Sequence, residues 1–262
     1  MNSENLVFAD VQDEVLDRYN IKYNRKTKSM IYLNKNIDIE VLVECCRELK
    51  VSSYSFKLEE IYSSMKIENN SLSKWETASV LDGNIIDDKQ KDSLETMNLV
   101  HATNTFNNYP ITEEIIKAIH LLICVSTHSG NELLDYRKEN VYIEGSSFVP
   151  QGWESVSESI KELVEIYNKD IDILDALKFK LSFVTINPFI DGNRRTSRLL
   201  LNSILSNIGY GRLVINPRDK YLYCQALENA QVNGEFDEYL RFMLNAYIKQ
   251  YYSIAMFKQE LE

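Results

Sequence analysis

Apolar residues recur every three to four positions along most of this chain, which is the period of an amphipathic helix. The clearest case is residues 111–125, where Ile115, Ile119, Leu122 and Ile123 would share one face. The same period predicts further helices over residues 54–66, 73–81, 88–107, 155–168, 173–186, 199–205, 221–230 and 236–252. We therefore predict a mainly α protein whose helices bury their apolar faces against one another.

Two segments depart from the helical period. In residues 141–150, Val141 and Ile143 alternate with polar neighbours before a turn at Gly145, which predicts a small β-hairpin. A solitary hairpin in a helical protein can simply cover an edge of the core, and the pattern leaves that alternative open. Residues 30–50 predict a short strand or hairpin followed by a helix.

The composition agrees with a helical protein, and the net charge argues against one class of partner. The 262 residues include only 8 Gly and 4 Pro, which leaves few breakers for an all-β design. A net charge of -10 argues against a nucleic-acid partner, because phosphate backbones are bound by clustered positive charge. Four cysteines, with Cys45 and Cys46 adjacent, do not resemble a secretory disulfide framework. Without a signal peptide or a long apolar run, we expect a cytoplasmic protein that does not enter a membrane.

The segment with the most chemistry is residues 187–198, NPFIDGNRRTSR. A turn around Gly192 precedes an apolar helix, so backbone N–H groups and the positive end of the helix dipole are available to an anion. Arg195 and Arg198 are three residues apart and would share a face of the first turn, where two guanidinium groups can bind a polyphosphate. Asp191 can bind the accompanying Mg²⁺. An ordinary helix connection with solvated arginines explains the spacing equally well.

This segment resembles the signature of the Fic (Fido) family, His-x-Phe-x-(Asp/Glu)-Gly-Asn-Gly-Arg-x-x-Arg. The matching positions are Phe189, Asp191, Gly192, Asn193, Arg195 and Arg198. The resemblance implies a Fic/Fido helical bundle with a small β-hairpin, called the flap. It also implies ATP as the nucleotide, Mg²⁺ at Asp191, and nucleotide contacts from Gly192, Asn193, Arg194, Arg195 and Arg198.

Two positions depart from the signature, and both concern the chemistry. The family's histidine is Asn187 here. In the family this histidine is the general base that takes the proton from a target hydroxyl as the hydroxyl attacks the α-phosphate of ATP, which transfers AMP. A carboxamide has no useful basicity near neutral pH, and a general base typically contributes about 10² to 10⁴-fold. We therefore expect weak or absent AMP transfer. The sequence is compatible with a natural Asn187 or with one introduced to inactivate a parent chain.

The second departure is Arg194, which stands where the family has a glycine. The related death-on-curing toxins carry lysine at this position and transfer phosphate instead, although they retain the histidine. Three hypotheses stay open: a nucleotide-binding protein with weak or no AMP transfer, a transferase of AMP or phosphate with another base, and a non-catalytic scaffold that holds a protein segment.

An upstream segment, residues 63–70, resembles the family's inhibitory helix, (Ser/Thr)-x-x-x-Glu-(Gly/Asn), through Ser64, Glu68 and Asn69. In relatives the glutamate pairs with the arginine that corresponds to Arg198 and obstructs the γ-phosphate. Such a charge-assisted pair competes directly with phosphate oxygens. Without the resemblance, Glu68 is one more carboxylate on a solvated helix face.

The segment before the motif also resembles the family. The similar residues are Tyr136, Arg137, Val141, Ile143, Gly145 and Pro150. The resemblance implies that the flap, residues 141–150, holds a protein target by strand addition. It also divides the chain into an N-terminal extension (1–53), a helical region with the inhibitory motif (54–110) and a Fido core (111–250). A homo-oligomer stays open.

A histidine elsewhere in the chain could replace the missing base. The chain has His101, His120 and His128, and none has metal-ligand spacing with another histidine or a cysteine. His120 borders the apolar face of a helix, where we expect a hydrogen-bonded core residue. The sequence locates no substitute for the missing base.

Overall fold

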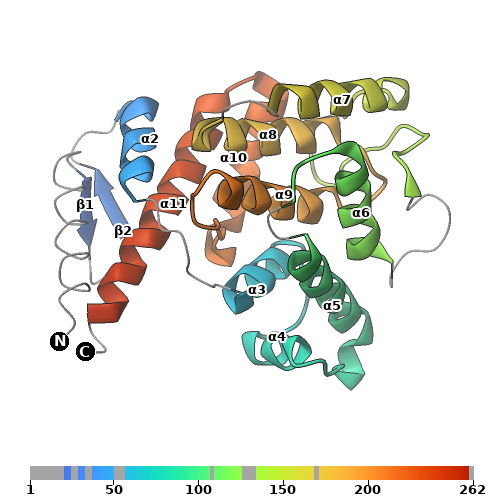
Figure 1. Cartoon of the computed structure of the whole chain (residues 1–262), viewed down its shortest axis with the longest axis horizontal. Helices are drawn as coiled ribbons and strands as arrows, with labels where there is room; N and C mark the ends of the chain where they lie inside the picture. The colour runs from blue at the N-terminus through green and yellow to red at the C-terminus, as the bar shows by residue number, and fades with distance from the viewer. Residues whose placement is uncertain are drawn as a thin grey trace.

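The computed structural model describes residues 21–24, 29–32, 37–49, 57–106, 109–125, 134–167 and 171–259, and within these it is built mainly of α-helices (Figure 1). The helices are α2 (Ile39–Glu48), α3 (Lys57–Ile67), α4 (Lys74–Leu81), α5 (Gln90–Thr105), α6 (Glu113–Cys124), α7 (Val156–Tyr167), α8 (Ile173–Ile186), α9 (Asn193–Asn207), α10 (Lys220–Asn233) and α11 (Phe236–Gln259). Short 3-10 turns are η1 (Asp87–Lys89), η3 (Trp153–Ser155) and η4 (Pro217–Asp219).

The N-terminal part contains a short strand followed by a helix, as predicted for residues 30–50, and the strand pairs with an earlier one outside that range. Strands β1 (Ile21–Asn24) and β2 (Ser29–Tyr32) pair antiparallel. Helix α2 follows and packs along α11, with a smaller contact to α8 (Figure 1). Its buried face includes Leu42 and Cys46. The described part of the predicted N-terminal extension therefore shares its core with helices from the other end of the chain.

Helix α8 lies at the centre of the core and leads into the motif. Its start is fixed by a capping box between Asp172 and Asp175. Apolar side chains cover most of its circumference, because α7, α9, α11 and α2 all pack against it. The helix ends at Asn187, which has a left-handed backbone (φ 51°, ψ 62°). Asparagine tolerates this conformation better than most residues. The helix end alone can therefore explain an asparagine at this position, without a chemical role.

Helices α3, α4 and α5 form the lower part of the molecule in Figure 1. Helix α4 begins with a capping box in which Ser73 and Glu76 exchange hydrogen bonds. Helix α3 contacts α4, α5 and α9, so the segment that resembles the inhibitory helix lies against the helix that follows the motif.

The mainly α prediction is confirmed, and helix boundaries lie within a few residues of those predicted, apart from the longer ends of α9, α10 and α11. Residues 54–56, 107 and 168 and His128 lie outside the described residues. Among the described helices, none is both long and apolar enough to cross a membrane.

The hairpin predicted over residues 141–150 is wrong in its strand pairing. These residues form a loop with a turn at Glu144 and Gly145, closed by a hydrogen bond from the Ser146 N–H to the Ile143 carbonyl. The two arms of this loop keep the predicted alternation of half-buried and exposed side chains without forming a ladder between them. Alternating apolar and polar residues indicate that one face of a segment is buried. The core of the protein can bury that face without a second strand beside it.

Candidate active site

The motif forms a closed loop between α8 and α9. Gly192 is the N-cap of α9 and has a positive φ of 78°, and the side chain of Asn193 closes the loop behind it. The Asn193 amide donates to the Phe189 carbonyl (2.7 Å) and its oxygen accepts from the Phe189 N–H (2.9 Å). Sequence reasoning treated Asn193 as a nucleotide contact. Its side chain is committed to the loop, so it shapes the site from within.

Helix α6 packs against the motif loop. The ring of His120 stacks on Phe189 with 3.7 Å between centroids, and its Nε2 lies 3.0 Å from the Asp191 carbonyl oxygen. A side chain at Gly192 would place its Cβ 2.7 Å from the Cys124 sulfur. Position 192 therefore requires glycine both for its positive φ and for space. His120 is buried and hydrogen-bonded, as expected, but its contact with the motif backbone could not be read from sequence.

Arg195 and Arg198 lie on one face of the first turns of α9, and their side chains are only 6% and 9% exposed. Arg195 pairs with Asp191 through Nη2 at 3.2 Å. Its Nη1 is buried and has no hydrogen-bond partner among the described residues. A buried guanidinium donor without a partner is costly, so this nitrogen is suited to an anion bound at the helix start.

Arg198, in contrast, is fully engaged by the segment around α3. Its Nη1 lies 2.7 Å from Glu68 Oε1, its Nε donates to the Ser64 hydroxyl (2.8 Å) and its Nη2 donates to the Ser64 carbonyl (2.9 Å). The adjacent Asn69 has a left-handed backbone and accepts a hydrogen bond from Lys220 of α10. The structure thus brings together the two segments that the sequence singled out, 130 residues apart.

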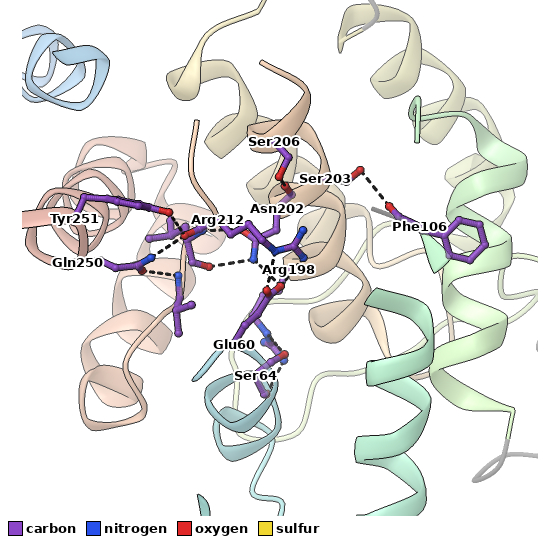
Figure 2. A network of polar contacts seen from close by, with 12 residues as sticks. Glu60, Ser64, Phe106, Arg198, Asn202, Ser203, Ser206, Arg212, Gln250 and Tyr251 are labelled. Carbon is purple, nitrogen blue, oxygen red and sulfur yellow. Dashed lines mark hydrogen bonds and ion pairs between the residues drawn. The ribbon is translucent and has the colours of Figure 1, made fainter. Parts of the chain in front are cut away.

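A second anchor holds α3 two turns before Glu68 (Figure 2). The buried carboxylate of Glu60 receives two hydrogen bonds from Arg212, at 2.7 and 2.6 Å, and one from Asn202 of α9 at 2.9 Å. The Arg212 carbonyl in turn accepts hydrogen bonds from Gln250 and Tyr251 of α11. Sequence reasoning missed this anchor, because Glu60 and Arg212 are 152 residues apart and carry no motif.

We expect Glu60→Gln to destabilise the chain by about 1–3 kcal/mol, because it leaves the Arg212 cation buried without its carboxylate. Urea unfolding followed by circular dichroism measures this. The matched control is Glu59→Gln, whose partner Lys74 is half exposed and whose loss should cost under about 0.5 kcal/mol. Equal destabilisation by the two variants would contradict the proposed anchor.

A cavity of about 20 Å³ lies beside this network and is lined by Ser64, Leu99, Arg198 and Asn202 among others. That volume holds about one water molecule, whereas ligand sites span about 300–1,000 Å³. The cavity is therefore packing space behind α3 and not a nucleotide site.

Beneath the α9 arginines, Lys180 of α8 is fully buried. Its ammonium nitrogen donates to the hydroxyls of Tyr223 (2.7 Å) and Tyr239 (3.2 Å). Burial, and then the positive charges of Arg198 and Arg194, hold the pKa of Lys180 well below its ordinary value. The two tyrosine hydroxyls thus satisfy a buried nitrogen whose charged form is disfavoured by its surroundings.

The tip of the 141–150 loop is tied to α10 by Glu228. One carboxylate oxygen accepts from the Ser147 N–H (2.7 Å), the Ser147 hydroxyl (2.9 Å) and the Ser146 hydroxyl (3.1 Å). The hydrogen bond from the Ser147 N–H is the main reason that the pKa of Glu228 lies below its ordinary value of 4.5. Because this pKa is depressed in the folded chain, the contact is fully present above pH 4.5 and is lost as the pH falls through the lower value.

We expect the Ser147 amide resonance to titrate with a midpoint below pH 4.5, and Glu228→Gln to abolish that titration. A ¹⁵N-resolved NMR titration from neutral to acid pH measures both. Glu235→Gln, on the turn after α10, is the control and should leave the Ser147 titration in place. An Ser147 amide that does not respond to acid would show that Glu228 is not its acceptor.

A model of the Fic/DOC family matches residues 110–205, which include α6, the 141–150 loop, the motif and most of α9. The protein adenylyltransferase Fic of Aedes aegypti is 30% identical over 210 residues, covering 74% of this chain and 41% of the relative. The chain thus spans about two fifths of that relative's length.

Solved structures share the fold. Fic-1 from C. elegans has a TM-score of 0.72 at 20% identity and covers 99% of this chain and 74% of its own. A complex of IbpAFic2 with adenylylated Cdc42 has a TM-score of 0.56 at 13% identity, covering 92% of this chain and 76% of its own. The chain therefore belongs to the Fic/DOC family, with its mainly helical fold.

Proposed function

We propose that this chain binds ATP at the start of α9 and is related in function to protein adenylyltransferases, with AMP transfer weak or absent because Asn187 stands in place of the base. The observation that carries the proposal is the pair of buried arginines beside the Gly192 turn, one of which keeps a buried donor nitrogen without a partner among the described residues. Neutral or solvated side chains would suffice for an ordinary helix connection.

In this proposal each residue of the loop has a separate role in binding or positioning. The α9 N-terminus and the close backbone approach at Gly192 hold phosphate oxygens. Arg195 binds them through its buried donors, and the half-buried Arg194 stands beside them. Asn193 contributes by keeping the loop closed. Asn187 can hydrogen-bond a target hydroxyl and position it, but it cannot accept its proton.

The proposed Mg²⁺ fits the one carboxylate of the loop. The Asp191 side chain is 56% exposed at the mouth of the loop, with Arg195 on one of its oxygens. Mg²⁺ is commonly held by one or two carboxylates together with substrate phosphates, so one exposed carboxylate is a sufficient protein contribution. When bound, the ion would neutralise phosphate charge.

We propose that Ser64, Glu68 and Asn69 act as the inhibitory motif. Glu68 and Ser64 contact all three guanidinium nitrogens of Arg198, so a phosphate must compete with the Glu68 carboxylate for this arginine. Arg195 stays available while Arg198 is engaged. The site as it stands would therefore accept fewer phosphate contacts than the sequence alone suggests.

A protein target is the proposed acceptor, held along the 141–150 loop. The two arms of this loop form no ladder with each other, which leaves backbone groups for strand addition. The complex of IbpAFic2 with adenylylated Cdc42 shows that a protein of this fold can bind a modified protein. If AMP transfer is absent, the same loop would make the chain a scaffold.

Phosphate transfer is the second candidate, because Arg194 places a long cation where the family signature has glycine. Incubating the chain with ATP labelled on either the α- or the γ-phosphate distinguishes the candidates. Label from the α-phosphate on protein supports AMP transfer, and label from the γ-phosphate supports phosphate transfer. No label together with no ATP binding, even in the Glu68→Gly variant, leaves the scaffold.

A further inference from the structure

Arg137 is buried near the motif, as Arg195 and Arg198 are, with 3% of its surface exposed. Among the described residues, no carboxylate forms an ion pair with it. Burial lowers the pKa of this guanidinium, and the charge of Glu154 only partly opposes that effect. A buried cation without an ion pair is costly, so its hydrogen bonds must explain its place in the fold.

On one side, Arg137 binds the end of α8. Its Nε donates to the Asn187 carbonyl (2.8 Å), its Nη2 lies 3.4 Å from the Ile186 carbonyl, and its backbone N–H donates to the Pro188 carbonyl (2.8 Å). The last carbonyls of a helix lack helical partners, and a cation is favourable there. Arg137 therefore fixes the peptide groups on both sides of the Asn187 side chain.

On the other side, Arg137 binds both ends of the 141–150 loop. Its Nη1 donates to the Glu139 carbonyl (2.9 Å) and its Nη2 donates to the Gln151 carbonyl (2.6 Å). One planar guanidinium thus joins the two stems of the loop to the helix end that carries position 187. Lysine could keep the charge, but it has no rigid fork that reaches both sides.

We propose that Arg137 is a positioning residue that holds the stems of the 141–150 loop and the backbone of Asn187 as one unit. A protein segment bound along the loop would then meet position 187 at a fixed distance. This inference rests on the proposed function for its catalytic meaning, while the mechanical coupling itself is independent of ATP. A misplacement of about 1 Å can cost about 10²-fold in rate, which is why such coupling matters.

Hydrogen exchange of the full chain, read by mass spectrometry, tests the coupling without any activity. Arg137→Lys should speed exchange at least about tenfold both in peptides covering residues 138–153 and in those covering 186–193, with α5 unchanged. Glu228→Gln, which frees only the loop tip, should affect the first region and not the second. If Arg137→Lys affects one region alone, or α5 equally, the proposal is overturned.

The wild-type chain provides the same test if Arg137→Lys does not fold. Native-state exchange in low urea should then show the Arg137, Asn187 and Phe189 amides opening together, with one free energy and one urea slope. These three amides donate within the unit, to Pro188, Phe183 and Asn193. Separate openings would overturn the proposal.

The catalytic consequence is tested in the Asn187→His, Glu68→Gly background with Mg-ATP and the chain itself as acceptor. Arg137→Lys should lower kcat at least about tenfold and leave the KM for Mg-ATP within about twofold, because the α9 phosphate contacts are untouched. A parallel rise in KM would mean a general collapse of the site and would overturn the positioning role. If the background itself transfers no AMP, the proposal that Asn187 alone accounts for weak transfer fails, while the exchange result still decides the coupling.

Discussion

Replacing Asn187 with histidine in a chain that also carries Glu68→Gly is expected to raise AMP transfer by about 10² to 10⁴-fold over Glu68→Gly alone. Histidine supplies the proton acceptor that a carboxamide lacks, and glycine at 68 frees Arg198. The backbone at position 187 is left-handed (φ 51°). Histidine, like asparagine and aspartate, is enriched among residues with left-handed dihedral angles, so it can be accommodated there. Transfer is measured as label from α-phosphate-labelled ATP on the chain and on protein acceptors.

Asn187→Ala with Glu68→Gly is the matched control and should stay at the level of Glu68→Gly alone, since neither side chain is a base. A histidine variant no faster than this control would indicate that Arg194 or another change has disabled the site. Adding Arg194→Gly would then separate these causes, because it removes the long cation next to the phosphate loop. A gain from that change would assign the defect to Arg194.

Glu68→Gly is expected to bind Mg-ATP saturably in a calorimetric titration, with at least about tenfold higher affinity than the parent chain, because the Nη1 group of Arg198 loses its carboxylate partner and can bind phosphate. Arg195→Ala in the same background should then cost at least about 100-fold. Hydrogen bonds to charged groups contribute about 1.5–3 kcal/mol each, and one guanidinium can make two.

Asn69→Gly is the control for Glu68→Gly. It changes the next residue of the same turn, where the positive φ of 65° suits glycine, and it leaves the Glu68 to Arg198 pair in place. Its affinity for Mg-ATP should match that of the parent chain. Binding that survives Arg195→Ala would place the nucleotide elsewhere, and no binding by Glu68→Gly would leave only the scaffold hypothesis.

Local patterns predicted the helices because each helix buries a stripe that the 3.6-residue period reveals. The anion-binding loop was equally local, since Gly192 and the arginines lie within one turn and its helix. Long-range contacts were accessible only through the resemblance, which related Glu68 to Arg198. The anchor of Glu60 on Arg212 and the ties of Arg137 lie outside any motif, because they depend on where remote backbone carbonyls and side chains meet.

The structure corrected one interpretation and added a structural role to another residue. The alternation over residues 141–150 was read as a hairpin, yet a loop with one covered face gives the same pattern. That Asn193 contacts the nucleotide stays a prediction, and the structure adds that its amide satisfies both backbone groups of Phe189. Sequence shows which polar side chains are available, while the fold decides whether the backbone uses them first.

The engagement of Arg198 by Glu68 has a kinetic and cellular meaning because both residues belong to one chain. A tethered group acts at an effective concentration that reaches the millimolar range for short connections, and dilution of the protein does not lower it. Glu60 adds a rigid mount that narrows the positions Glu68 can take. In the proposed inhibition, a free nucleotide would therefore compete with a carboxylate whose effective concentration is constant. Changes in protein abundance alone would leave the occupancy of Arg198 unchanged, whereas any partner that draws α3 away would alter it.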